Sequence, residues 1–188
     1  MALKQGALEK DHMERQRFAV IGTGGRSEMY WSALGKDPEI MERNQLVALL
    51  DPNHTRMELV KRELNANLPT YQPHEFERMV AEQKLDGIVV ACRDSLHATY
   101  IIRGLEAGLR VITEKPMTVD APSCQAIVDA ARGREDKLTV TFNYRYAPLN
   151  TKVKELVHNG EIGEVTLVSF SLFLDITHGA DYYRRWHR

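Results

Sequence analysis

The residues best suited to chemistry form a glycine-rich turn near the start of the chain. The sequence reads Gly22-Thr23-Gly24-Gly25-Arg26-Ser27, which meets the first two positions of the pattern G-x-G-x-x-G and places a small serine at the third. The first glycine of such a turn permits a tight reversal, and the second lets the backbone approach a pyrophosphate. A helix that begins here offers unpaired amides and the positive end of its dipole to phosphates. Gly25 adds backbone freedom, and Arg26 could reach a phosphate.

Asp51 is the candidate partner of this turn. It ends a second apolar run and lies somewhat further from Gly24 than the ~20 residues usual for an acidic partner, because residues 37–44 lengthen the connection. A carboxylate at this place accepts hydrogen bonds from the adenosine ribose and repels a 2′-phosphate, so it favours NAD over NADP. Two alternatives stay open: the turn could be a plain strand-to-helix connection, and Asp51 a turn aspartate before Pro52.

The elements that must position these residues follow from the apolar pattern. Short runs that are apolar throughout predict strands at residues 17–21, 46–50, 85–91, 109–113 and 138–142. Helical segments lie between them, around Met29 to Leu34 and over residues 53–64, 95–107 and 120–131. Strands without polar alternation are buried on both faces, and their alternation with helices indicates βαβ units. The predicted fold class is therefore α/β, with a doubly wound parallel Rossmann sheet.

The alternation of predicted strands and helices changes near Asn143. A helix is predicted over residues 148–158 and one long strand over residues 165–176. We therefore expect a polar leader at 1–17, a dinucleotide-binding domain at 18–142, and the beginning of a second domain at 143–188. The isolated strand would have unpaired edges and favour self-association.

Composition excludes several classes of protein. The net charge is −1, with 43% hydrophobic and 27% charged residues, so neither a nucleic-acid surface nor an acidic membrane is an expected partner. The two cysteines, Cys92 and Cys124, lack CxxC spacing, so no disulfide framework and no metal site are expected. No apolar run approaches the ~20 residues that span a bilayer, and no signal-like segment stands at the start. These features favour a cytoplasmic protein.

Several short motifs follow one another in a distinctive order. The most specific, Thr113-Glu114-Lys115-Pro116, comes directly after a predicted strand. The others are Val20-Ile21-Gly22-Thr23-Gly24, Leu50-Asp51-Pro52, Asp94-Ser95-Leu96-His97, Asn143-Tyr144-Arg145-Tyr146 and Gly160-Glu161-Ile162-Gly163-Glu164-Val165. Together this set resembles the Gfo/Idh/MocA oxidoreductases, which act mainly on sugars and polyols. The resemblance implies that residues 143–188 begin an α+β substrate and dimerisation domain with an open antiparallel sheet, which is incomplete here.

The resemblance implies roles for residues that follow the predicted strands at 109–113 and 138–142. Lys115 matches the family's active-site lysine, which binds the reacting hydroxyl and assists its proton transfer. An ammonium group beside an alcohol would stabilise developing alkoxide charge. Glu114 matches a residue near the nicotinamide ribose, and Asn143 and Arg145 match positions that flank the nicotinamide and the substrate. On the residues alone, Lys115 could instead be a solvated surface lysine, and Arg145 could join an ion pair between domains.

The resemblance also implies a cofactor contact for the loop at the end of the predicted strand over residues 85–91. Ala91, Cys92 and Arg93, with His97, match a loop that covers the cofactor, although Cys92-Arg93 replaces the commoner Thr-Pro. His97 could equally be an ordinary histidine at a helix N-terminus. All of these residues join Gly22, Gly24 and Asp51 in the predicted site.

The implied function is NAD-dependent hydride transfer between nicotinamide and a secondary alcohol of a sugar or polyol. Two alternatives are a glycosidase that oxidises its substrate transiently and a non-catalytic dinucleotide-binding regulator. Members of the family are normally much longer and form homo-oligomers, and their catalytic aspartate and histidine would follow Arg188. We therefore expect this chain to bind NAD without turnover. No role is assigned to Asp175 or His178, and only a weak substrate contact to Arg184, Arg185 or His187.

Overall fold

A computed structural model describes residues 14–173, 175–176 and 180. Within them, six parallel strands form one sheet in the order β3-β2-β1-β4-β5-β6. The strands are β1 (Gln16–Ile21), β2 (Asn44–Leu50), β3 (Thr70–Tyr71), β4 (Gly87–Val90), β5 (Arg110–Thr113) and β6 (Leu138–Val140). The chain runs outward from β1 in one direction and, after β3, returns to place β4 on the other side of β1. The predicted doubly wound Rossmann sheet is confirmed.

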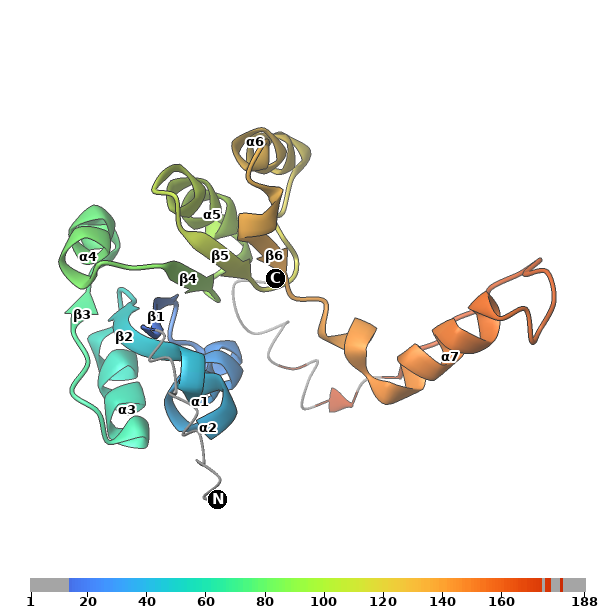
Figure 1. Ribbon diagram of the computed structural model, residues 1–188, viewed down its shortest axis with the longest axis horizontal. Helices are drawn as coiled ribbons and strands as arrows, with labels where there is room; N and C mark the ends of the chain where they lie inside the picture. The colour runs from blue at the N-terminus through green and yellow to red at the C-terminus, as the bar shows by residue number, and fades with distance from the viewer. Residues whose placement is uncertain (1–13, 174, 177–179, 181–188) are drawn as a thin grey trace, which may run out of the picture. The chain divides into compact units, whose positions relative to one another are not determined.

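Helices cover both faces of the sheet (Figure 1). They are α1 (Glu28–Lys36), α2 (Pro38–Arg43), α3 (His54–Leu64), α4 (Phe76–Gln83), α5 (His97–Glu106) and α6 (Ala121–Ala131). Start signals in the sequence explain their bounds. Asn53 accepts a hydrogen bond from the Arg56 amide at the start of α3, and Asp120 accepts one from the Ser123 amide at the start of α6. These caps satisfy amides that lack a partner within the helix.

Alternation along each buried strand divides the core into two clusters. Phe18 and Val20 of β1 point to the face covered by α1 and α3, where they join Trp31 and Met57. Ala19 and Ile21 point to the opposite face, which packs against α4, α5 and α6. Both faces of β1 are therefore buried from Phe18 to Ile21, as the apolar run in its sequence predicts.

The chain divides into two compact units, Met1–Phe142 and Asn143–Arg188. The second unit contains the short 3-10 helix η5 (Asn143–Tyr146) and α7 (Pro148–His158), which begins at the residue that the sequence indicates. Strand β1 begins at Gln16, inside the segment expected to be a polar leader, whose residues 1–13 lie outside the described residues.

The strand predicted over residues 165–176 is wrong. Residues 165–173 form neither helix nor strand and are exposed to solvent. A β-strand is stabilised by backbone hydrogen bonds to a neighbouring strand. Among the described residues of the second unit, no other strand is present to form these bonds. Among the strands and α-helices, α2, β3 and α4 were not predicted. Strand β3 has only two residues, too few to form an apolar run.

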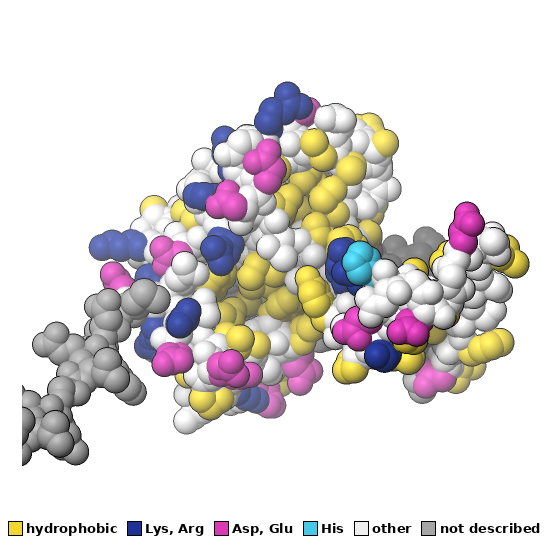
Figure 2. Space-filling model, turned by 45° about the vertical axis from the view of Figure 1, so that its right-hand side comes forward, with side chains coloured by type: hydrophobic (Ala, Val, Ile, Leu, Met, Phe, Trp, Pro, Cys, Tyr) yellow, Lys and Arg dark blue, Asp and Glu magenta, His cyan; other side chains and the backbone are white. Residues whose placement is uncertain are grey.

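The surface carries mixed charge. On the face shown in Figure 2, Lys and Arg side chains lie among Asp and Glu side chains, and neither sign gathers into one broad patch. No helix in the described ranges combines the length and apolar character needed to cross a bilayer.

Candidate functional site

The glycine turn lies where the strand order reverses. Gly22 follows β1 with φ +88°, a conformation that favours glycine, and its amide donates to Leu50 O at 2.8 Å. A Cβ at Gly22 would lie 2.5 Å from Cys92 Cα, so the turn is pressed against the loop that follows β4. Such a crevice between the ends of two diverging βα units is where open parallel sheets bind ligands.

The next residues of the turn present open backbone. A Cβ at Gly25 would meet no atom within 4 Å, and a Cβ at Gly24 would meet only Arg56 Nη1, at 4.0 Å. Gly25 begins η1 (Gly25–Ser27), which leads directly into α1, so its first amides have no partner within the helix. Thr23 Oγ1 is buried without a hydrogen-bond partner among the described residues. Open backbone, helix amides and an orphaned hydroxyl fit a bound pyrophosphate.

Ser27 replaces the third glycine at little structural cost. It is fully buried, and its hydroxyl donates to Gly24 O at 2.6 Å. The serine therefore satisfies its own polar group inside the turn while remaining small enough for close helix–strand packing. Its position supports the shape of the turn, with the side chain directed into the protein.

Asp51 stands at the end of β2, one strand away from the turn. The carboxylate is buried; Oδ2 accepts from the Thr23 amide at 2.7 Å, and Oδ1 accepts from the Asn53 amide at 2.7 Å. The structure thus connects Asp51 directly to the glycine turn. A carboxylate offers about four acceptor positions, so two backbone bonds leave capacity for the hydroxyls of a ribose.

The loop after β4 holds the three predicted residues Ala91, Cys92 and Arg93. Ala91 is buried, Cys92 is half-buried and Arg93 is exposed. Burial raises the pKa of the Cys92 thiol to about 12, and the nearby Asp51 carboxylate acts in the same direction. Cys92 is therefore a neutral packing residue against Gly22 at neutral pH.

His97 lies at a helix N-terminus, as the sequence indicates, and its ring contacts two backbone segments. It is buried at the start of α5, with Nδ1 2.8 Å from Pro116 O and Nε2 3.2 Å from Cys92 O. Both ring nitrogens therefore face backbone carbonyls of this protein. The ring joins the loop after β4 to the segment after β5, which carries Lys115, and this geometry suits a bridging residue.

Glu114 follows β5 and is 3% exposed. Its Oε1 accepts from Arg26 Nε at 2.8 Å, from Arg26 Nη2 at 2.7 Å and from the Tyr30 hydroxyl at 2.7 Å. Burial opposes ionisation of the carboxyl, but the hydrogen bonds from Arg26 and Tyr30 outweigh it and hold its pKa below the ordinary value. The carboxylate therefore links the glycine turn to the end of β5.

Lys115 is exposed immediately beside this buried carboxylate. Its backbone amide donates to Glu114 Oε2 at 3.0 Å. The residue before it and the residue after it are both held, Glu114 by α1 and Pro116 by His97. Lys115 thus projects from a backbone fixed on both sides, at the same edge of the sheet as the glycine turn.

The remaining residues named for the site in the sequence analysis lie in the second unit. Asn143 and Arg145 lie in η5 of the second unit and are exposed. Asp175 is exposed, and His178, Arg184, Arg185 and His187 lie outside the described residues. In the part of the chain that is described, no three His, Cys, Asp or Glu side chains are arranged to hold a metal ion.

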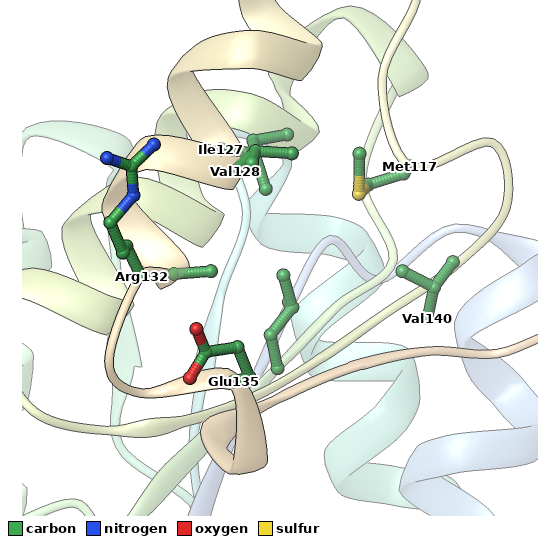
Figure 3. Close-up of a pocket in the computed structure, with 8 residues that line it drawn as sticks. Met117, Ile127, Val128, Arg132, Glu135 and Val140 are labelled. Carbon is green, nitrogen blue, oxygen red and sulfur yellow. The ribbon is translucent and has the colours of Figure 1, made fainter.

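An apolar cavity of about 320 Å³ lies apart from these residues (Figure 3). It is lined by side chains of α6, β6 and their connection, with Met117 at one side and Arg132 and Glu135 at another. No residue predicted to bind the cofactor lines it. The cavity therefore belongs to the outer edge of the sheet, beyond the predicted site.

Two residues of the candidate site, Tyr30 and Thr141, were not predicted from the sequence. Tyr30 reads as one more apolar position of α1, and Thr141 as part of a strand, yet their hydroxyls lie 2.7 Å apart and Tyr30 reaches Glu114. Tyr30 and Glu114 are far apart in sequence, so no local signal could have found this contact. The sequence also gives no sign that the Thr23 hydroxyl is buried without a hydrogen-bond partner among the described residues.

Comparison with known proteins agrees with this geometry. A family model described as "Oxidoreductase family, NAD-binding Rossmann fold" (GFO_IDH_MocA) matches residues 16–142. The oxidoreductase YteT of Bacillus subtilis (strain 168) is 37% identical over 146 residues, which are 77% of this chain and 34% of YteT. D-xylose 1-dehydrogenase (NADP(+)) of Hypocrea jecorina is 29% identical over 79% of this chain and 39% of its own.

A solved structure shares the fold. Scyllo-inositol dehydrogenase from Lactobacillus casei, determined with NAD(H) and scyllo-inositol, superimposes with a TM-score of 0.72 at 20% identity. The match covers 81% of this chain and 44% of the dehydrogenase. The chain thus spans less than half the length of these relatives. With a family model matching across the whole Rossmann sheet, the chain belongs to the Gfo/Idh/MocA oxidoreductases and contains their NAD-binding domain.

Proposed function

We propose that the protein acts as an NAD-dependent oxidoreductase on a secondary alcohol of a sugar or polyol, with Lys115 as its catalytic residue. The observation that carries this proposal is the contact between Arg26 and Glu114, at 2.7 Å. It links the turn that fits a pyrophosphate to the residue immediately before Lys115. The lysine would therefore stand beside the reactive end of a dinucleotide that begins at the turn.

The residues present divide the work as follows. Bound NAD would supply a hydride acceptor at nicotinamide C4. During oxidation the Lys115 amine would accept the proton of the reacting hydroxyl and pass it to solvent, to which the side chain is exposed. The ammonium so formed would stabilise negative charge on the substrate oxygen. The glycine turn would hold the pyrophosphate through its open backbone.

Asp51 supports NAD as the preferred cofactor. Its buried carboxylate touches the turn through Thr23 N, so a ribose bound there would meet a negative charge and a free acceptor. An added 2′-phosphate would meet the same charge and be repelled. The relatives include an enzyme described as NADP(+)-dependent, so the preference has to be measured on this chain.

For residues 1–188 by themselves we propose binding without turnover. The matched residues span less than half of each relative named above. Substrate recognition in a two-domain oxidoreductase needs more surface than the Rossmann unit offers, and Asn143 and Arg145 are exposed in the second unit. In the full-length form we expect a homo-oligomer with a sugar or polyol as its substrate and no nucleic-acid or membrane partner.

Ligand-dependent unfolding tests the cofactor step. We expect NAD and NADH to raise the Tm, with dissociation constants between micromolar and millimolar. A ligand present at 100 times its dissociation constant adds about 2.7 kcal/mol to the free energy of unfolding, an easily measured shift. No shift with NAD(H) or NADP(H) would refute the proposal.

Turnover is tested separately by absorbance of NADH with a panel of inositols and aldoses. We expect cofactor binding but no NADH from residues 1–188. Steady NADH formation by these residues would contradict binding without turnover and support the dehydrogenase chemistry directly. Sugar cleavage without net NADH would instead favour the glycosidase alternative.

A further inference from the structure

A chain of hydroxyl groups leads from β6 to the buried Glu114 carboxylate. The Tyr30 hydroxyl lies 2.7 Å from Glu114 Oε1 and 2.7 Å from Thr141 Oγ1. The Glu114 carboxyl is ionised at neutral pH, because its pKa is held below the ordinary value, so Tyr30 must donate to it. The Thr141 hydroxyl contacts the Tyr30 hydroxyl, can donate to Thr113 O at 3.0 Å, and lies 3.4 Å from Glu114 Oε1. Burial raises the pKa of Tyr30 to about 12, which keeps the proton of its hydroxyl in place.

The two oxygens of Glu114 perform different tasks. Oε1 receives the side chains of α1, while Oε2 accepts from the Lys115 backbone amide at 3.0 Å. A carboxylate is planar and rigid, so a contact that fixes Oε1 also fixes the direction of Oε2. The position of the Lys115 backbone therefore depends on what holds Oε1.

Tyr30 and Arg26 share this task unequally. The Arg26 side chain is 46% exposed, so solvent screens its attraction to Glu114. Tyr30 is half-buried and belongs to α1, which is packed against the sheet through Trp31 and Leu34. A hydrogen bond from a donor on such a fixed element defines the carboxylate's orientation more closely than one from a flexible, solvated side chain.

We propose that Tyr30 is a positioning residue, which orients the Glu114 carboxylate and through it fixes the backbone from which Lys115 projects. The role of Lys115 in chemistry rests on the proposed function, but the coupling of Tyr30 to the Lys115 backbone does not. This coupling is a property of the chain alone and can be measured without cofactor or substrate.

The test uses the Lys115 backbone amide as a reporter in an NMR pH titration of the 188-residue chain. Because this amide donates to Glu114, its chemical shift follows ionisation of that carboxyl. Glu114→Gln establishes the assignment, since it should abolish the acid transition of this one peak. Tyr30→Phe removes only the hydroxyl and should raise the midpoint of the transition, because the charged carboxylate loses a donor.

The expected size is that of one hydrogen bond to a charged group. The midpoint in Tyr30→Phe should rise by about one pH unit, and hydrogen exchange of the Lys115 amide should accelerate roughly tenfold. Thr141→Val should move the midpoint in the same direction by less, because Thr141 contacts the Tyr30 hydroxyl at 2.7 Å and Glu114 Oε1 only at 3.4 Å. It also provides the test if Tyr30→Phe fails to fold.

Tyr71→Phe is the matched control. The Tyr71 hydroxyl also donates to a carboxylate, Glu82 Oε2 at 2.9 Å, but on α4, away from Glu114. It should leave the Lys115 amide unchanged. The proposal is overturned if the Lys115 transition in Tyr30→Phe coincides with the wild-type transition, or if Tyr71→Phe moves it equally. Failure of the chain to bind NADH would refute the proposed function while leaving this result intact.

Discussion

Asp51 has two tasks in this structure, and substitutions can separate them. It holds the Thr23 and Asn53 amides, and it places negative charge where a ribose would lie. We expect Asp51→Ala to weaken NAD by about tenfold or more and NADP by less, because only NADP is repelled by the lost charge. Titration of both cofactors into each variant measures the difference.

Asp51→Asn is the control that keeps the shape of the side chain. It retains one acceptor oxygen and removes the charge, so it should shift the preference towards NADP with a smaller loss of stability than Asp51→Ala. Equal weakening of NAD and NADP in both variants would show that the carboxylate does not meet the ribose.

The Cys92 thiol should react slowly with alkylating reagents. Its pKa is raised from 9.0 to about 12 by burial, so its thiolate fraction at pH 8 falls by a factor on the order of 1000. We expect alkylation of Cys92 by iodoacetamide to be slow in the native chain and fast after denaturation, as followed by mass spectrometry. Rapid native labelling would mean that the loop after β4 opens readily.

The close contact between the turn after β1 and the loop after β4 leaves no room for a side chain at Gly22. Gly22→Ala would place a Cβ 2.5 Å from Cys92 Cα at a residue whose φ is +88°. We expect it to lower the free energy of unfolding by roughly 2–5 kcal/mol, because left-handed strain and a backbone clash add. Denaturant unfolding measures this loss.

Gly25→Ala is the matched variant in the same turn. A Cβ there meets no atom within 4 Å, so stability should change by no more than about 0.5 kcal/mol. NADH affinity should nevertheless fall, because the methyl group would occupy the space through which a pyrophosphate approaches the backbone. Unchanged affinity in a stable Gly25→Ala chain would place the pyrophosphate elsewhere.

Elements with strong local signals could be predicted from sequence. The five strands other than β3 each overlap an apolar run of the sequence, and Asn53 and Asp120 cap the helices α3 and α6. Helix α2 was missed although Asp37 and Pro38 are good start signals, because its six residues were taken as part of a connection. The strand expected at residues 165–176 was wrong because apolar residues in a sequence cannot by themselves supply a hydrogen-bonded neighbour.

The site was predictable to the extent that its parts sit in motifs. The turn, Asp51 and Glu114-Lys115 could be placed at one edge of the sheet, because parallel strands all end there. How these parts hold one another could not be predicted. The bridge through His97 and the contact of Tyr30 with Glu114 both join distant segments, and only the tertiary structure brings them together.

At the scale of the whole molecule, the two units differ in how they are stabilised. All buried residues of both hydrophobic clusters lie between Phe18 and Ala131, within the first unit. In the second unit, Leu167 is 85% exposed, Phe170 81% and Phe173 95%. Clustered exposed apolar side chains of this kind promote association.

Removal of the second unit should therefore leave folding intact. We expect a chain that ends at Phe142 to keep its Tm within about 3 °C and to bind NADH as the 188-residue chain does, because the core and the Asp51 and Glu114 contacts are retained. Light scattering should find the 188-residue chain associating with rising concentration and the shorter chain remaining monomeric. If the shorter chain unfolds, residues 143–188 contribute to the stability of the Rossmann unit. If both chains stay monomeric, the exposed apolar residues of the second unit are covered in solution by that unit itself.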